Sequence, residues 1–91
     1  MAEVLVTLNV RLESPEVDAD AVQQAATKTI DSLGGKVGKS ETKELAFGLK
    51  ELFLHFFWPE EKGSADATEQ QVGALSGVQS AQITSVTRAL G

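Results

Sequence analysis

The chain has 91 residues, which is enough for one small domain with one modest core. It has no cysteine and a single histidine, His55, so a disulfide framework, a thiolate metal site and a multi-histidine metal site are excluded. Its formal net charge of -5 argues against a nucleic-acid-binding protein that relies on a general basic surface. We therefore expect a single domain over residues 1–91 that uses no cofactor and no metal and binds no nucleic acid directly.

Residues 4–12 alternate between apolar and other side chains, which is the pattern of a half-buried strand. Pro15 interrupts this strand, and Asp18 is the expected N-cap of a helix. The helix is expected to end at Gly34-Gly35. Its apolar stripe is thin and rich in alanine, which favours close packing on a sheet. The stripe comprises Ala21, Val22, Ala25, Ala26, Thr29, Ile30 and Leu33.

Residues 36–44 are polar and charged, which favours an edge strand. Residues 49–58 are apolar on both faces, which is typical of a strand in the middle of a sheet. Pro59 ends this strand because proline cannot donate to a ladder. Alternation places Leu52, Leu54, Phe56 and Trp58 on one face and Phe53, His55 and Phe57 on the other. Between the two strands, Ala46-Phe47-Gly48 predicts a turn.

Residues 60–64 predict a loop and residues 66–75 a second helix, with Ser64 as its N-cap and Gly77 beyond its end. The inner side of this helix is expected to carry Ala65, Thr68, Val72 and Leu75. Residues 78–90 predict the last strand. Its apolar members are irregularly spaced, which indicates a bulge or a change of register. They are Val78, Ala81, Ile83, Val86 and Leu90.

The predicted order is strand, helix, strand, strand, helix, strand. This βαββαβ order is that of the ferredoxin-like α+β fold. Right-handed crossovers then place both helices on one face of a four-stranded antiparallel sheet. We expect the strands at residues 4–12 and 49–58 in the middle, since they are the most apolar.

Bond-making catalysis is not expected. Acylphosphatases have a similar length and fold, but the loop after the first strand is acidic here (residues 13–16) where they carry a phosphate-binding arginine. Glu60-Glu61 is a carboxylate pair in a loop that we expect to be solvated, and His55 has no partner in sequence. The sequence also has no apolar run of membrane-spanning length and no basic leader at residues 1–3. We therefore expect a cytoplasmic protein with no membrane partner.

Two segments carry a resemblance to a known family. Residues 45–52 read LAFGLKEL, and residues 78–90 read VQSAQITSVTRAL. With the strand order and the total length, they resemble the nucleotide-exchange domain of translation elongation factor 1-beta. The opening, a strand followed by Glu-Ser-Pro-Glu-Val-Asp and a helix, is similar to the archaeal form, which is a single domain of about this length. The resemblance therefore covers the whole chain.

The resemblance implies guanine-nucleotide exchange, with release of GDP from elongation factor 1-alpha, the GTPase that delivers aminoacyl-tRNA to the ribosome. It implies that Phe47, on its turn with Gly48, presses into the GTPase near the nucleotide and magnesium site. It implies that Arg88, where eukaryotic relatives have lysine, reaches toward the magnesium and phosphate region. Lys50 is expected to assist beside the turn. An exchange factor needs no covalent chemistry, only tighter binding to the nucleotide-free GTPase.

Two other functions stay open from the sequence. Leu5, Phe53, His55 and Phe57 are expected to form an apolar patch on the sheet face away from the helices. Such a patch often marks an interface, either with the GTPase or in a weak homodimer. A small dimerisation or ligand-binding regulatory module of the same fold is therefore an alternative. The third function, an acylphosphatase-like enzyme, is opposed by the acidic loop at residues 13–16.

Overall fold

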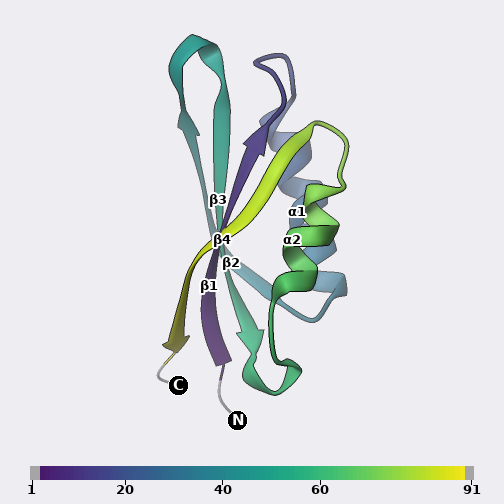
Figure 1. Cartoon of the computed structure of the whole chain (residues 1–91), viewed down its shortest axis with the longest axis vertical. Coiled ribbons are helices and arrows are strands. Elements are labelled where there is room, and N and C mark those ends of the chain that lie inside the picture. Colours follow the sequence, from purple (N-terminus) through teal and green to yellow (C-terminus); the bar gives the residue numbers. More distant parts are fainter. Residues whose placement is uncertain (1–2, 90–91) are drawn as a thin grey trace.

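The computed structural model describes residues 3–89, and it has the predicted βαββαβ order (Figure 1). The elements are β1 (Glu3–Leu12), α1 (Ala19–Ser32), β2 (Lys36–Glu44), β3 (Lys50–Pro59), α2 (Asp66–Gly73) and β4 (Val78–Ala89). Short 3-10 turns at Ala46–Gly48 and Glu60–Lys62 flank β3. Leu90, which we assigned to the last strand, lies outside the described residues.

The sheet confirms the ferredoxin-like α+β arrangement. Its strand order is β2-β3-β1-β4 with antiparallel neighbours, so β1 and β3 lie in the middle as predicted. Both helices cover the same face of the sheet (Figure 1). Among residues 3–89, no helix is long and apolar enough to cross a membrane.

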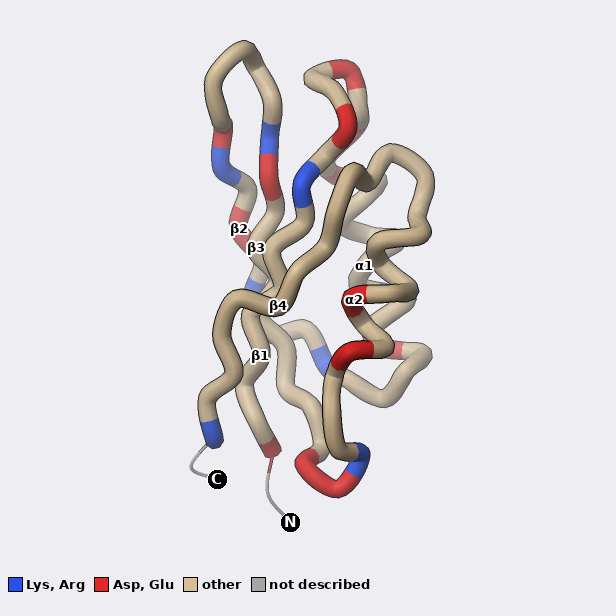
Figure 2. Tube along the Cα trace, viewed as in Figure 1, with Lys and Arg blue, Asp and Glu red and all other residues tan. Residues whose placement is uncertain are grey.

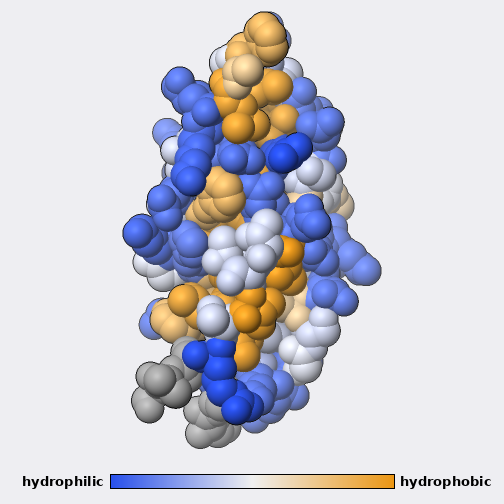
Figure 3. All heavy atoms as spheres, turned by 60° about the vertical axis from the view of Figure 1, so that its left-hand side comes forward, coloured by the Kyte–Doolittle hydropathy of each residue, from blue (hydrophilic) through white to orange (hydrophobic). Residues whose placement is uncertain are grey.

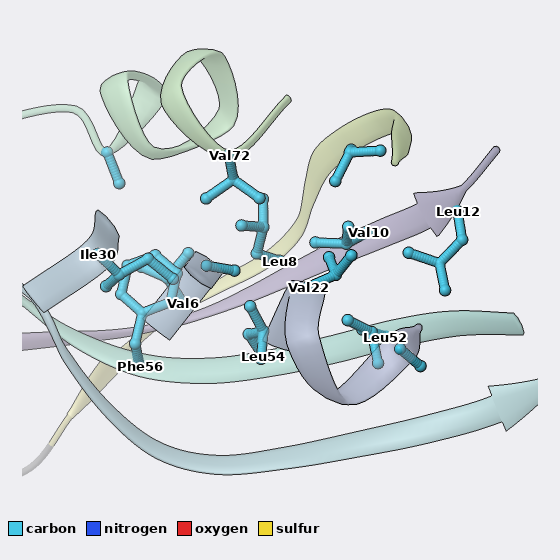
Figure 4. Packing of buried hydrophobic residues seen from close by; sticks show 14 of the residues in the cluster. Val6, Leu8, Val10, Leu12, Val22, Ile30, Leu52, Leu54, Phe56 and Val72 are labelled. Carbon is cyan, nitrogen blue, oxygen red and sulfur yellow. The ribbon is translucent and has the colours of Figure 1, made fainter. Parts of the chain in front are cut away.

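The core lies between the two central strands and the two helices (Figure 4). Alternate residues of β1 and β3 point toward the helices, and the side chains at its centre are fully buried: Val6, Leu8, Val10, Leu52, Leu54 and Phe56. Helix α1 adds Ala19, Val22, Ala26 and Ile30, while α2 adds Val72 and Thr68. Phe56 packs edge-to-face on Trp58, with ring centroids 6.2 Å apart. Ala21 was part of the predicted apolar stripe, but it is exposed. The buried face of α1 is therefore narrower than the stripe of apolar residues in the sequence.

Helix α1 begins as predicted, because Asp18 Oδ1 accepts hydrogen bonds from the backbone N–H groups of Asp20 (3.0 Å) and Ala21 (3.3 Å). The second helix begins at Asp66 as predicted, but its predicted N-cap and its predicted end were wrong. Its N-cap is Ala65, although Ser64 Oγ still accepts from the Asp66 N–H at 3.1 Å.

The C-terminal end of α2 lies two residues before the predicted one, at Gly73. Glycine is a weak helix former, so it favours termination there. Gly77, expected to end the helix, instead lies in the turn before β4, with a φ of 87°. A Cβ on Gly77 would lie 2.8 Å from Val17 Cγ1, so glycine also permits a close approach there.

Strand β4 contains the predicted irregularity. Its register with β1 shifts between Thr7 and Leu8 and again between Arg11 and Leu12. Near the first shift, the N–H of Ile83 donates to Glu69 Oε2 of α2 at 2.6 Å. This bond anchors the irregular edge strand to the helix that covers it.

Gly35 and Gly38 offer a matched test of the packing between α1 and β3. A Cβ on Gly35 would lie 2.7 Å from Ile30 Cγ2 and 3.2 Å from Phe56 Cδ2, inside the core. On Gly38 it would meet Phe57 Cε2 at an ordinary 3.5 Å. We expect Gly35→Ala to lower the free energy of unfolding by about 1–3 kcal/mol through overpacking. Gly38→Ala should change it by less than about 0.5 kcal/mol.

The two variants are compared by urea unfolding. Equal midpoints for Gly35→Ala and the wild-type protein would contradict the close approach of α1 to β3 at Gly35.

Candidate functional site

Phe47 is an exposed aromatic residue in the left-handed region of the backbone map. Its relative exposure is 94% and its φ is 63°, the only positive φ outside glycine among residues 3–89. This conformation costs a non-glycine residue roughly 1–2 kcal/mol. With its side chain so exposed, Phe47 gains little from packing to offset that cost. Such a strained, exposed aromatic is a candidate for a contact with another molecule.

The turn that carries Phe47 is the tip of the β2–β3 hairpin, at the end of the molecule far from both termini (Figure 1). The Leu45 N–H donates to the Leu49 carbonyl oxygen at 2.6 Å and closes the turn. Gly48 has a φ of 77°, and a Cβ there would lie 3.5 Å from Pro15 Cβ of the loop after β1. Phe47 is thus presented on a short closed turn beside a second loop.

Lys50 is the first residue of β3 and pairs with Glu44 of β2. Its side chain is half-buried, and it lies three positions from Phe47. The structure therefore groups three of the four predicted site residues at one place, which we call the hairpin tip: Phe47, Gly48 and Lys50.

Arg88 lies at the opposite end of the sheet. It is near the end of β4, opposite Val4 of β1, and its side chain is 69% exposed. Its Nη2 donates to Glu60 Oε1 at 2.5 Å, forming an ion pair with the 3-10 turn that follows β3. Sequence reasoning assigned Glu60 to a solvated loop and missed this pairing, because 28 residues separate the two side chains along the chain.

The hairpin tip and Arg88 are far apart. On β1, Arg11 pairs with Glu51 next to the tip, whereas Val4 pairs with Arg88. Seven residue steps of strand separate these positions, or roughly 23 Å at 3.3 Å per residue. Phe47 and Arg88 therefore cannot meet at one point, and a partner that touches both must extend along the sheet.

The open face of the sheet carries the four residues of the expected apolar patch together with charged side chains. Leu5, Phe53, His55 and Phe57 do share this face, but charged side chains from β2 lie among them. Figure 3 shows apolar areas separated by polar ones. The sequence did not reveal these charged neighbours, because it does not show which β2 side chains lie beside the aromatic residues of β3.

His55 has two partners on this face that the sequence did not reveal. Its Nδ1 lies 3.0 Å from Thr7 Oγ1, and its Nε2 lies 3.2 Å from Glu41 Oε1. Close by, Lys43 Nζ lies 4.9 Å from the centre of the Phe53 ring. Within residues 3–89, no group of three or more acidic, histidine or cysteine side chains is placed to hold a metal ion.

Comparison with known proteins gives one consistent result. A family model described as "EF-1 guanine nucleotide exchange domain" matches residues 5–89. Proteins named "Elongation factor 1-beta" are similar over 97% of this chain. The one from Methanobrevibacter smithii is 35% identical, with 98% of its own length covered. That from Sulfurisphaera tokodaii is 34% identical with 97% covered, and that from Halobacterium salinarum is 30% identical with 99% covered.

The strain at Phe47 can be measured by substitution at that residue alone. Phe47→Ala removes an exposed ring and keeps the left-handed backbone, so the free energy of unfolding should change by less than about 0.5 kcal/mol. Phe47→Gly relieves the strain and should be more stable than Phe47→Ala by about 1 kcal/mol. Urea unfolding of both variants tests this difference. Equal stabilities would show that residue 47 is not held in the left-handed region.

Proposed function

The chain belongs to the EF-1 guanine nucleotide exchange domain family, and we propose that it releases GDP from elongation factor 1-alpha through contacts at both ends of its sheet. Family membership itself supports guanine-nucleotide exchange in translation elongation. The choice of GTPase, the use of residues 1–91 as one exchange domain, and the two contacts are the proposal.

The conformation of Phe47 carries the proposal. Aromatic residues supply much of the binding energy in protein interfaces, where they enter well-packed pockets of the partner. The Phe47 ring is already exposed to solvent, and the hydrogen bond that closes the turn holds the backbone of the turn in place. Its ring therefore needs little rearrangement before it enters a pocket on the GTPase. Gly48 supports the turn, and Lys50 places a cation beside it.

Arg88 supplies the second contact, at the other end of the sheet. A guanidinium is always protonated, and its planar fork of donors matches phosphate and carboxylate oxygens. A cation brought into the nucleotide and magnesium site would compete with Mg²⁺ for those oxygens. The affinity of the GTPase for the nucleotide falls as a result. By linkage, bound nucleotide lowers the affinity of the GTPase for the exchange protein to the same extent. In this mechanism no covalent bond forms or breaks in the exchange factor, so the protein is not an enzyme in the bond-making sense.

The alternative, a dimerisation or ligand-binding module, has less support. The apolar patch on the open face is the surface that could make a homodimer, and charged side chains from β2 lie among its residues. The proposed function does not require a homodimer.

The proposal is tested by release of a fluorescent GDP analogue from an archaeal elongation factor 1-alpha in excess unlabelled nucleotide. We expect the wild-type protein to accelerate release at amounts well below those of the GTPase. Phe47→Ala and Arg88→Ala should each slow stimulated release by about tenfold or more, since the loss of a central interface contact costs about 2 kcal/mol.

Lys28→Ala serves as the matched control for Arg88→Ala, because Lys28 is an exposed cation on α1, across the domain from the open face. It should leave the stimulated rate unchanged. The proposal would be contradicted if the wild-type protein left the rate of GDP-analogue release from a cognate GTPase unchanged, both at amounts well below that of the GTPase and at an equimolar amount.

A further inference from the structure

We propose that Glu60 is a positioning residue that orients Arg88 for its contact with the GTPase. The inference rests on the proposed function, because it concerns how one of the two contacts is prepared. It starts from the ion pair between Arg88 Nη2 and Glu60 Oε1.

The geometry of the pair orients Arg88 without using up its donors. A guanidinium carries five N–H groups in a rigid fork. Among residues 3–89, Arg88 makes one side-chain hydrogen bond, through Nη2, and its side chain stays 69% exposed. Most of its donors therefore remain available to an anionic group of a partner.

Glu60 is attached to a rigid part of the domain. It follows Pro59 at the end of β3, and its carbonyl oxygen accepts from the Gly63 N–H at 3.0 Å. The Gly63 carbonyl oxygen in turn accepts from Trp58 Nε1 at 3.2 Å. Trp58 is only 4% exposed and belongs to the core. The turn that carries the Glu60 carboxylate is thus fixed by a buried indole.

Arg88 lies on a less constrained element. Strand β4 is an edge strand that pairs only with β1. A long side chain at the end of such a strand samples many rotamers in solution, and binding a partner in one of them is entropically unfavourable. An anchored carboxylate reduces that number of rotamers before the partner arrives, which lowers the entropic loss on binding.

Stability is a poor explanation for the pair. The side chains are 69% and 40% exposed, and exposed ion pairs contribute little to folding because water and salt screen them. Removing the Glu60 carboxylate should therefore change exchange more clearly than it changes unfolding.

The neighbouring Glu61 provides a matched control. It is an exposed carboxylate in the same 3-10 turn, and it has no ion-pair partner within residues 3–89. Glu60→Ala and Glu61→Ala cause the same change in net charge. Any effect that comes from overall charge or from the turn itself should appear in both variants.

The experiment measures GDP-analogue release from an archaeal elongation factor 1-alpha with Glu60→Ala and Glu61→Ala, each in the wild-type and the Arg88→Ala background. We expect Glu60→Ala to slow stimulated release about threefold, which is the fold-change that corresponds to the loss of one exposed ion pair. Glu61→Ala should have no effect. In the Arg88→Ala background, Glu60→Ala should cause no further loss, because its effect passes through Arg88. Thermal unfolding midpoints of all variants should agree.

Nuclear magnetic resonance of the Arg88 Nε–H group in the free protein gives a readout that does not need the GTPase. Its order parameter should fall in Glu60→Ala and stay unchanged in Glu61→Ala. An unchanged order parameter in Glu60→Ala would overturn the positioning role.

Three kinetic results would overturn the inference while leaving the proposed function intact. The first is an equal rate of stimulated release for Glu60→Ala and Glu61→Ala, and the second is faster release with Glu60→Ala than with the wild-type protein. The third is that Glu60→Ala slows release by the same factor in the Arg88→Ala background as in the wild-type background. Failure of the wild-type protein to stimulate release would instead overturn the proposed function, and this inference with it.

Discussion

The burial of one face of the central strand pair is the constraint on which the rest of the structure depends. Val6, Leu8 and Val10 of β1 and Leu52, Leu54 and Phe56 of β3 are fully buried against the helices. Because side chains alternate along a strand, a slip of one residue would turn this whole set to solvent. The register between β1 and β3 is therefore strongly determined. That register in turn fixes which residues lie at each end of the sheet.

The two ends of the sheet present different groups to solvent, an aromatic ring at one end and an ion pair at the other. At one end the β2–β3 hairpin extends to a closed turn that displays Phe47 in a strained conformation (Figure 1). At the other end, Arg88 forms an ion pair with Glu60 of the 3-10 turn that follows β3. Figure 2 shows acidic positions on this turn, between β3 and α2. The packed core joins these two ends of a domain that extends 43 Å along its longest axis. This separation would let the proposed contacts at Phe47 and Arg88 reach different parts of a larger partner.

The strand-strand arrangement also explains why the open face does not resemble a simple docking patch. Strand β2 carries lysines and glutamates that protect an edge from unwanted pairing. The same residues lie beside the aromatic side chains of β3, where Glu41 meets His55 and Lys43 covers Phe53. A feature that protects the edge thus makes the neighbouring face polar. The exposed aromatic Phe47 and the exposed cation Arg88 lie instead at the two ends of the sheet.

The sequence by itself determined the fold class, the central and edge strands, the capping of α1 by Asp18 and the turn at Phe47. These features depend on local periodicity and on residues with strong backbone preferences. It also gave the resemblance on which the functional hypothesis was built. Only the tertiary structure decided the partners of His55, the pairing of Arg88 with Glu60, and the distance between Phe47 and Arg88. Each of these depends on contacts between residues far apart in the chain, which periodicity within one segment cannot specify.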